Sequence, residues 1–311
     1  MTLQQAMAGI RVGEPMVYGG LAVFPLIGGK PGNRDYLTLR EAFDRRGIEI
    51  SEVSEGGSVP ELRLKNLMGQ DVFAADGEAL LGAKQNRVLN VSIYVKAHDE
   101  VVIPVSCVEQ GRWSYRRRNF EASKYHEFMS SRAAKMASVA SSLKYGTGSR
   151  RSDQGAVWDE MSAKRTYFQA DAPTGSMEDV YEAGRPAMRQ YLKNIRTQPG
   201  QIGLACAIDG DTTGIELFES TDVFNQFFEK LVMSYAAEVV FENKIATMVP
   251  DKAGLEDLLK RIGNAPHDRY DAVGSGTELR FDLGRLNGSA LEVDDRLLHL
   301  VLLKNRGRTR H

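Results

Sequence analysis

Cysteine is scarce in this sequence, and metal-ligand patterns are absent from it. Only two cysteines, Cys107 and Cys206, occur in 311 residues. That is too few for a disulfide scaffold and is typical of proteins in a reducing compartment. The five histidines show no HxH or HExxH spacing, and no CxxC pair accompanies them. We therefore expect no zinc or other metal site.

The sequence also lacks long apolar runs and a strong net charge. No apolar stretch approaches the roughly 18 residues of a membrane span. The first sixteen residues lack the basic flank and apolar core of a signal peptide. The formal net charge is -1, so no global field attracts nucleic acid or membranes. We expect a cytoplasmic protein that does not contact a membrane and recognises its partners through local features.

The chain changes character along its length, from strands to helices to a mixture. Hydrophobic residues make up 42% and charged residues 26%, which excludes wholesale disorder. Short alternating segments predict strands in residues 1–118, with turns between them. Ala-, Met- and Lys-rich stretches predict helices in residues 119–199, and residues 200–311 mix both types. Within these regions the expected helices cover 37–46, 121–143, 154–168, 176–197, 222–240 and 252–262.

These patterns predict an α+β fold. The strand-rich N-terminal half is expected to be antiparallel and sandwich- or barrel-like. The middle is helical, and the C-terminal unit is small and mixed. The three segments are expected either as separate domains or as one integrated domain.

One glycine-rich segment nearly matches a phosphate-binding loop. Residues 77–85 read GEALLGAKQ, close to GxxxxGK[ST], but with an extra Ala83 and with Gln85 in place of the hydroxyl residue. A phosphate loop must also run into a helix, whose N–H groups bind the phosphate. The residues that follow are β-branched and alternating, so we expect a strand here and no phosphate loop.

Two alternating segments, 88–95 and 101–108, predict an antiparallel hairpin. Their odd positions are apolar and include Cys107, which is typical of inert core packing. Pairing the segments around the turn at 96–100 places Arg87 opposite Glu109, with Gln85 near Gly111. A slip of one residue would expose the apolar face, whereas a slip of two would not.

A charged pair on a buried face allows two interpretations. It is either a structural ion pair at the end of a sheet or part of a polar pocket that binds a ligand. In the second interpretation Glu78 or Glu109 would act as acid or base. The expected ligand-binding residues are Lys84, Gln85, Asn86, Arg87, Arg112 and Trp113.

Basic residues cluster in segment 111–151. It contains ten basic and two acidic residues, a balance of plus eight in a chain of -1. The basic residues are Arg112, Arg116, Arg117, Arg118, Lys124, Arg132, Lys135, Lys144, Arg150 and Arg151. Such a block is either a solvated face or a surface that attracts phosphates, an acidic protein or nucleic acid.

The residues of the expected pocket also carry a family resemblance. The strings VPEL (59–62), GE (77–78), GAKQNR (82–87) and VSCVEQGRW (105–113), with the segment 203–240, form its signature. The chain resembles an uncharacterised family named for gene association with ADP-ribosylglycohydrolases and rhodanese-like phosphatases. The likeness spans most of the chain. It implies a role near NAD-derived or ADP-ribose-containing metabolites.

Two functions are therefore expected from different classes. The first is binding, with hydrolysis or transfer as a further step, of a phosphate-containing, nucleotide-like metabolite. The second is a non-enzymatic interaction or scaffold protein whose polar cluster is structural. The sequence implies no particular cofactor and leaves open both enzyme activity and oligomeric state.

Overall fold

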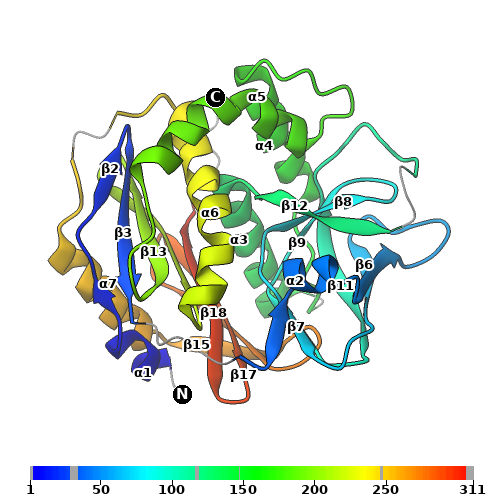
Figure 1. Cartoon of the computed structure of the whole chain (residues 1–311), viewed down its shortest axis with the longest axis horizontal. Coiled ribbons are helices and arrows are strands. Elements are labelled where there is room, and N and C mark those ends of the chain that lie inside the picture. The colour runs from blue at the N-terminus through cyan, green and yellow to red at the C-terminus, as the bar shows by residue number, and fades with distance from the viewer. Residues whose placement is uncertain (1–2, 29–33, 116–118, 147, 246–247, 306–311) are drawn as a thin grey trace. The chain divides into compact units, whose positions relative to one another are not determined.

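The computed structural model describes residues 3–28, 34–115, 119–146, 148–245 and 248–305 (Figure 1). These residues form helices and mainly antiparallel sheets, which confirms the α+β class and the strand-rich N-terminal half. None of the described helices is long and apolar enough to cross a membrane.

The chain packs into two compact units that interleave along the sequence. One comprises residues 1–33, 185–270 and 277–311, and the other comprises residues 34–184 and 271–276. Helix α5 (Met177–Asn194) carries the chain from one unit into the other. The sequence predicted a division of the chain into the segments 1–118, 119–199 and 200–311. Whether these segments are separate domains stays a prediction.

The first unit is built on a large antiparallel sheet. Its strand order is β1-β3-β13-β14-β18-β17-β16-β15, with β2 paired to β3. The strands are β1 (Arg11–Val12), β2 (Met16–Tyr18), β3 (Leu21–Ile27), β13 (Gln201–Ile208), β14 (Asp211–Phe218), β15 (His267–Asp271), β16 (Thr277–Asp282), β17 (Leu286–Val293) and β18 (Arg296–Lys304).

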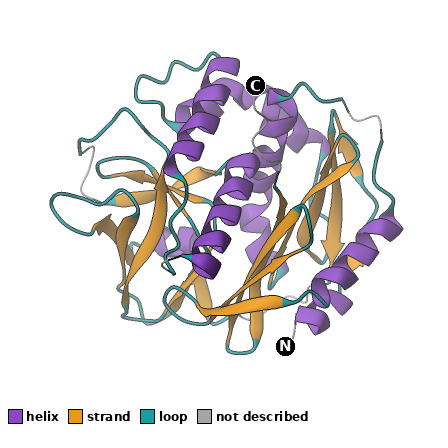
Figure 2. Ribbon diagram, turned by 180° about the vertical axis from the view of Figure 1, so that it is seen from behind, coloured by secondary structure: helices purple, strands orange, loops and turns teal. Residues whose placement is uncertain are grey.

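Helices cover both faces of this sheet. Helix α6 (Thr221–Phe241) packs against β13, β14 and β3, as Figure 1 shows in yellow. Helix α1 (Leu3–Ala8) packs against α7 (Lys252–Gly263) on the other face, near the N label in Figure 2. Because strand side chains alternate, Phe24 faces α1 and α7, whereas Phe218 stacks on Phe227 of α6.

The second unit contains the residues of the expected site. A six-stranded sheet has the order β12-β8-β9-β11-β6-β5, and a three-stranded sheet has the order β10-β7-β4. The strands are β4 (Tyr36–Thr38), β5 (Ile48–Glu52), β6 (Glu61–Asn66), β7 (Asp71–Ala74), β8 (Glu78–Gly82), β9 (Arg87–Leu89), β10 (Ile93–Val95), β11 (Glu100–Cys107) and β12 (Phe120–His126). The edge strands β12 and β5 contact each other, so the larger sheet curls towards a barrel.

Three helices lie wholly in this unit. They are α2 (Leu39–Asp44), α3 (Met129–Tyr145) and α4 (Gln154–Tyr167). The sequence prediction of one helix over 121–143 is wrong in its first part, because residues 120–126 form strand β12 and helix α3 begins at Met129. Phe120 and Tyr125 favour a strand, and both bury their side chains there.

Helix α2 begins with a capping box that makes its stability depend on pH. The Thr38 side chain accepts from the Glu41 N–H, and the Glu41 carboxylate accepts from the Thr38 N–H and from Arg34. Burial raises the pKa of Glu41, but the hydrogen bonds from Arg34 and Thr38 outweigh it and lower the pKa to about 2. The ionised carboxylate therefore stabilises the fold above its ordinary pKa of 4.5, and this contribution is lost as pH falls towards 2.

We expect Glu41→Gln to lower the free energy of unfolding by about 1 kcal/mol at pH 7, since the carboxylate is partly exposed and screened. The difference from wild type should shrink at pH 3. Urea denaturation at both pH values measures this. Asp44→Asn, in an exposed pair on the same helix, should change stability by less than about 0.5 kcal/mol. A pH-independent effect of Glu41→Gln would contradict the assignment.

Candidate functional site

The turn between strands β8 and β9 lies at the centre of the site. The two strands pair antiparallel, with Leu80 opposite Arg87, and residues 83–86 connect them. All four connecting residues are buried. Ala83 has a φ of 37°, a left-handed conformation that is uncommon for a residue with a side chain. Since β9 follows this turn directly, residues 77–85 do not form a phosphate loop, as expected.

The register predicted for Arg87 is wrong by two residues. Strand β9 does pair antiparallel with β11, but Arg87 lies opposite Cys107 and not opposite Glu109. The alternating segment 88–95 is not one strand. It breaks after Leu89, and β10 leaves to pair with β7 in the other sheet. No tight hairpin therefore fixes the register of the two strands. The observed register differs from the predicted one by two residues, a shift that the apolar pattern permits.

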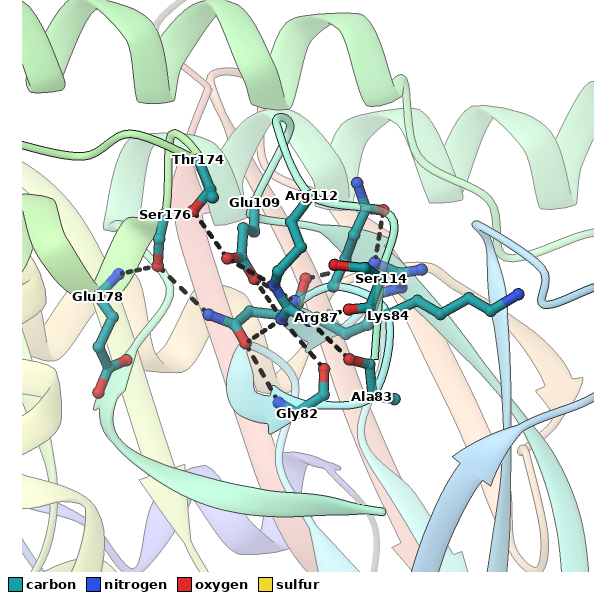
Figure 3. Close-up of polar contacts among 12 residues, drawn as sticks. Gly82, Ala83, Lys84, Arg87, Glu109, Arg112, Ser114, Thr174, Ser176 and Glu178 are labelled. Carbon is teal, nitrogen blue, oxygen red and sulfur yellow. Dashed lines mark hydrogen bonds and ion pairs between the residues drawn. The ribbon is translucent and has the colours of Figure 1, made fainter. Parts of the chain in front are cut away.

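Glu109 instead forms an ion pair with Arg112 (Figure 3). The Nε and Nη2 atoms of Arg112 donate to Glu109 Oε1 and Oε2 at 2.9 and 2.6 Å. Thr174 Oγ1 donates to Oε1 at 2.8 Å, and the Asn86 N–H donates to Oε2 at 3.0 Å. Burial raises the pKa of Glu109, but these bonds outweigh it and lower the pKa below its ordinary value. Glu109 is completely buried, so this pair has the character of a structural ion pair.

Arg112 also holds the β8–β9 turn in place. Its Nη1 donates to the carbonyls of Ala83 and Ser114 at 2.6 and 2.7 Å, and its Nη2 donates to the Gly82 carbonyl at 3.3 Å. Asn86 Oδ1 accepts from the Gly82 N–H at 3.2 Å. One guanidinium thus satisfies carbonyl oxygens that the sharp turn removes from the sheet ladder.

Arg87 has a different environment from Arg112. Its side chain is completely buried, and Nη1 donates to Gln85 Oε1 at 2.9 Å. The Nε and Nη2 atoms have no hydrogen-bond partner among the described residues. Burial lowers the pKa of Arg87 from its ordinary value, while Cys107 and Glu52 act in the opposite direction. A buried guanidinium with two unsatisfied nitrogen atoms is rare, because its desolvation is costly.

Gln85 and Cys107 lie beside this guanidinium. The Cys107 thiol donates to Gln85 Oε1 at 3.1 Å, and Gln85 Nε2 donates to the Gln110 carbonyl at 3.4 Å. Burial raises the pKa of Cys107 above its ordinary value despite the nearby Arg87. A buried thiol with a raised pKa is a poor nucleophile, consistent with a packing role.

Two aromatic residues and Lys84 cover the Arg87 side of the site. Lys84 Nζ donates to the carbonyls of Glu55 and Gly56 at 2.6 and 2.7 Å, and it lies 5.3 Å from the ring centroids of both Trp113 and Tyr115. Figure 3 shows Lys84 extending away from the Glu109–Arg112 pair. The Trp113 ring also lies 5.8 Å from Arg87 Cζ and is 48% exposed. Trp113 therefore separates Arg87 from solvent.

Glu52 belongs to the site but was not among the residues expected from sequence. It ends strand β5, where burial alternates, and its side chain follows Ile48 and Ile50 on the buried face. Its Oε1 accepts from the Lys84 N–H at 3.4 Å, and its Oε2 has no hydrogen-bond partner among the described residues. The period-two pattern Ile-x-Ile-x-Glu is the sequence signal that could have identified it.

Glu78 lies apart from the other expected residues. It begins strand β8, four residues and about 13 Å from Gly82, which borders the turn. Its Oε2 accepts from the Ala75 N–H at 3.0 Å. The neighbouring Asp76 is a buried partner of Arg132 and Lys135, so this end of β8 belongs to a separate buried charge network.

The basic segment 111–151 does not form one basic surface. Arg112, Arg132 and Lys135 are buried and paired with acidic side chains. Among the exposed members, Lys124 pairs with Glu182. Residues 116–118 lie outside the described part of the chain. The buried members therefore do not contribute to a surface that attracts phosphates, an acidic protein or nucleic acid, and this role stays a prediction for the exposed members.

Metal-binding geometry is lacking in the residues that the structure describes. They contain no group of three or more His, Cys, Asp and Glu side chains that could hold a metal ion. The chemistry available at the site is therefore that of a guanidinium, a carboxylate and aromatic rings.

Fold and site define an α+β protein with a buried arginine beneath an aromatic cover. The family model of the ARG and Rhodanese-Phosphatase-superfamily-associated Protein domain, ARPP-1, matches residues 9–303. The chain belongs to this family, and the resemblance noted in the sequence is confirmed. No curated protein and no solved structure shows significant similarity to the chain.

The ion pair of Glu109 yields a stability prediction. Glu109→Gln removes the partner of the buried Arg112, so we expect the free energy of unfolding to fall by about 3–5 kcal/mol. Glu100→Gln is the matched control, because Glu100 pairs with Arg63 on the surface and should cost less than about 1 kcal/mol. Urea denaturation measures both. Equal effects of the two substitutions would contradict the structural role of Glu109.

Proposed function

We propose that this protein binds a phosphate-containing, nucleotide-like metabolite through Arg87. The observation that carries the proposal is the pair of Arg87 nitrogen atoms, Nε and Nη2, that are buried without a hydrogen-bond partner among the described residues. These two atoms form one edge of the guanidinium fork. That edge matches two oxygen atoms of a phosphate or carboxylate.

The local charge favours an anion at this position. Three cations (Lys84, Arg87 and Arg112) face two carboxylates (Glu52 and Glu109), a balance of three minus two, or plus one. The Arg112–Glu109 pair is internally neutral, so the excess resides near Arg87. An anion there would satisfy the Arg87 donors and compensate the buried charge.

The aromatic cover favours a ligand with a planar group. Trp113 is half exposed, and its ring lies 5.8 Å from Arg87 Cζ and 5.3 Å from Lys84 Nζ. A phosphate bound at Arg87 must displace Trp113 from its position, and the displaced ring can then stack on a base. Membership in the ARPP-1 family agrees with an ADP-ribose-related ligand through the association stated in the family name.

The proposal is for binding and assigns no proton transfer to Glu109. Its carboxylate is ionised at a lowered pKa and accepts four hydrogen bonds. A general acid or base near neutral pH needs a raised pKa and access to its substrate. Glu109 fits a role in holding the turn that carries Arg87.

A scaffold function is the second candidate, and the sealed Glu109–Arg112 pair favours it. Such a pair needs no ligand. On this view Arg87 would also be structural, and its loss would destabilise the protein. The two functions therefore make opposite predictions for Arg87.

The binding prediction is tested with ADP-ribose and pyrophosphate as probes. We expect both to raise the melting temperature of wild type, since a ligand that binds only the folded state stabilises it. Arg87→Gln should weaken binding at least about tenfold, because a charge-assisted hydrogen bond is worth roughly 1.5–3 kcal/mol. Arg40→Gln, on the exposed face of α2, is the control. Unchanged binding by a folded Arg87→Gln protein would exclude Arg87 as the anchor.

A stability measurement distinguishes the proposed ligand-binding function from the scaffold function. We expect Arg87→Met to raise the free energy of unfolding of the ligand-free protein by about 1 kcal/mol, because it removes an uncompensated buried charge and keeps apolar volume. Arg112→Met should lower it by several kcal/mol, since it strands Glu109. Urea denaturation without ligand measures both. Comparable losses from the two substitutions would favour the scaffold function.

A further inference from the structure

A second buried atom in the site, a carboxylate oxygen of Glu52, has no hydrogen-bond partner among the described residues, and it is an acceptor. Glu52 is 9% exposed, and its Oε2 has no hydrogen-bond partner among the described residues. Its other oxygen accepts only the long bond from the Lys84 N–H, 3.4 Å. Buried carboxylate oxygens without a donor are as exceptional as buried guanidinium nitrogens without an acceptor. The site thus contains both a buried hydrogen-bond acceptor and buried hydrogen-bond donors without partners among the described residues.

Glu52 and Arg87 do not satisfy each other. They interact electrostatically, but no ion pair within 4.0 Å joins them. A direct pair would be the simplest way to compensate both charges in a protein interior. The arrangement instead suits a ligand that offers acceptor oxygens to Arg87 and a donor to Glu52.

The surroundings of Glu52 limit what this donor can be. Gly57 has a φ of +78°, and a Cβ added there would lie 3.2 Å from Glu52 Oε2, 3.3 Å from Lys84 Cδ and 3.3 Å from the Trp113 ring. Glu52, Lys84 and Trp113 therefore meet at Gly57, beneath the same aromatic cover as Arg87. A cationic amine there would face both Lys84 and Arg87, so a neutral hydroxyl is favoured.

We propose that Glu52 determines specificity by accepting a hydrogen bond from a hydroxyl of a phosphorylated sugar whose phosphate binds Arg87. The inference rests on the proposed function and narrows its ligand class. Carboxylates commonly accept hydrogen bonds from ribose hydroxyls at nucleotide sites on other folds. The same carboxylate repels an anion that brings no hydroxyl, so Glu52 selects against inorganic phosphates.

The test uses ribose 5-phosphate, methyl phosphate and pyrophosphate with wild type and Glu52→Gln, measured by titration calorimetry. Wild type should bind ribose 5-phosphate at least about tenfold more tightly than methyl phosphate. In Glu52→Gln this preference should collapse, and pyrophosphate should bind more tightly than to wild type. Glu49→Gln, an exposed neighbour on β5, is the matched control and should behave as wild type.

The outcomes separate this inference from the proposed function. If wild type binds pyrophosphate through Arg87 but does not prefer ribose 5-phosphate over methyl phosphate, the role of Glu52 is overturned and the anion site stands. Equal weakening of all three ligands by Glu52→Gln would also overturn it, since that marks a structural residue. If none of the ligands binds wild type, both proposals fail. The wild-type comparison decides the matter even if the variant does not fold.

Discussion

The ion pair between Arg112 and Glu109 is the constraint on which the site depends. A four-residue connection between antiparallel strands leaves carbonyl oxygens outside the ladder, and here those carbonyls are buried. Arg112 donates to the Gly82 and Ala83 carbonyls, and Glu109 fixes the guanidinium and accepts the Asn86 N–H. Without this pair the turn would have to open to water. Arg87 is the first residue of β9, so the conformation of this turn determines the direction of its side chain.

The two buried arginines show how differently one residue type can be used. Arg112 has a carboxylate partner and several carbonyls, so its desolvation is offset. Arg87 lies opposite Cys107 and makes its one short bond to Gln85, a neutral amide. The first arrangement is that of a structural element. The second retains a cost in stability that no described residue offsets, and such costs concentrate at functional sites.

The sequence pattern predicts the fold class well and the site only in part. Alternation in 88–95 and 101–108 identifies the buried face. It identifies the antiparallel partner correctly for β9 only, because β10 pairs with β7. It cannot distinguish registers that differ by two residues, because both bury the same face. The expected pairing of Arg87 with Glu109 failed for this reason. Arg112 was expected among the ligand-binding residues, and nothing in the spacing indicated that it would pair with Glu109, three residues earlier.

Other differences between expectation and structure come from tertiary contacts. Residues 120–126 have a composition compatible with the helix that follows, yet they pair with β8 and become an edge strand. The net charge of segment 111–151 misled for a related reason: Arg132 and Lys135 both pair with Asp76, which lies outside the segment. A local count of charge cannot reveal partners that the fold brings from elsewhere.

Lys84 connects the structural half of the site to its proposed binding half. The sequence suggested a phosphate ligand for its ammonium, but the Lys84 Nζ donates to the carbonyls of Glu55 and Gly56 and lies 5.3 Å from the centroids of two aromatic rings. These contacts tie the loop after β5 to Trp113. On the proposed function, an anion that binds Arg87 must move Trp113 away from Lys84, so ligand binding would be coupled to the displacement of Trp113. A buried donor pair beneath a cover of this kind binds only ligands whose additional contacts exceed the cost of moving the cover, which favours a ligand carrying a sugar and a base over a simple ion.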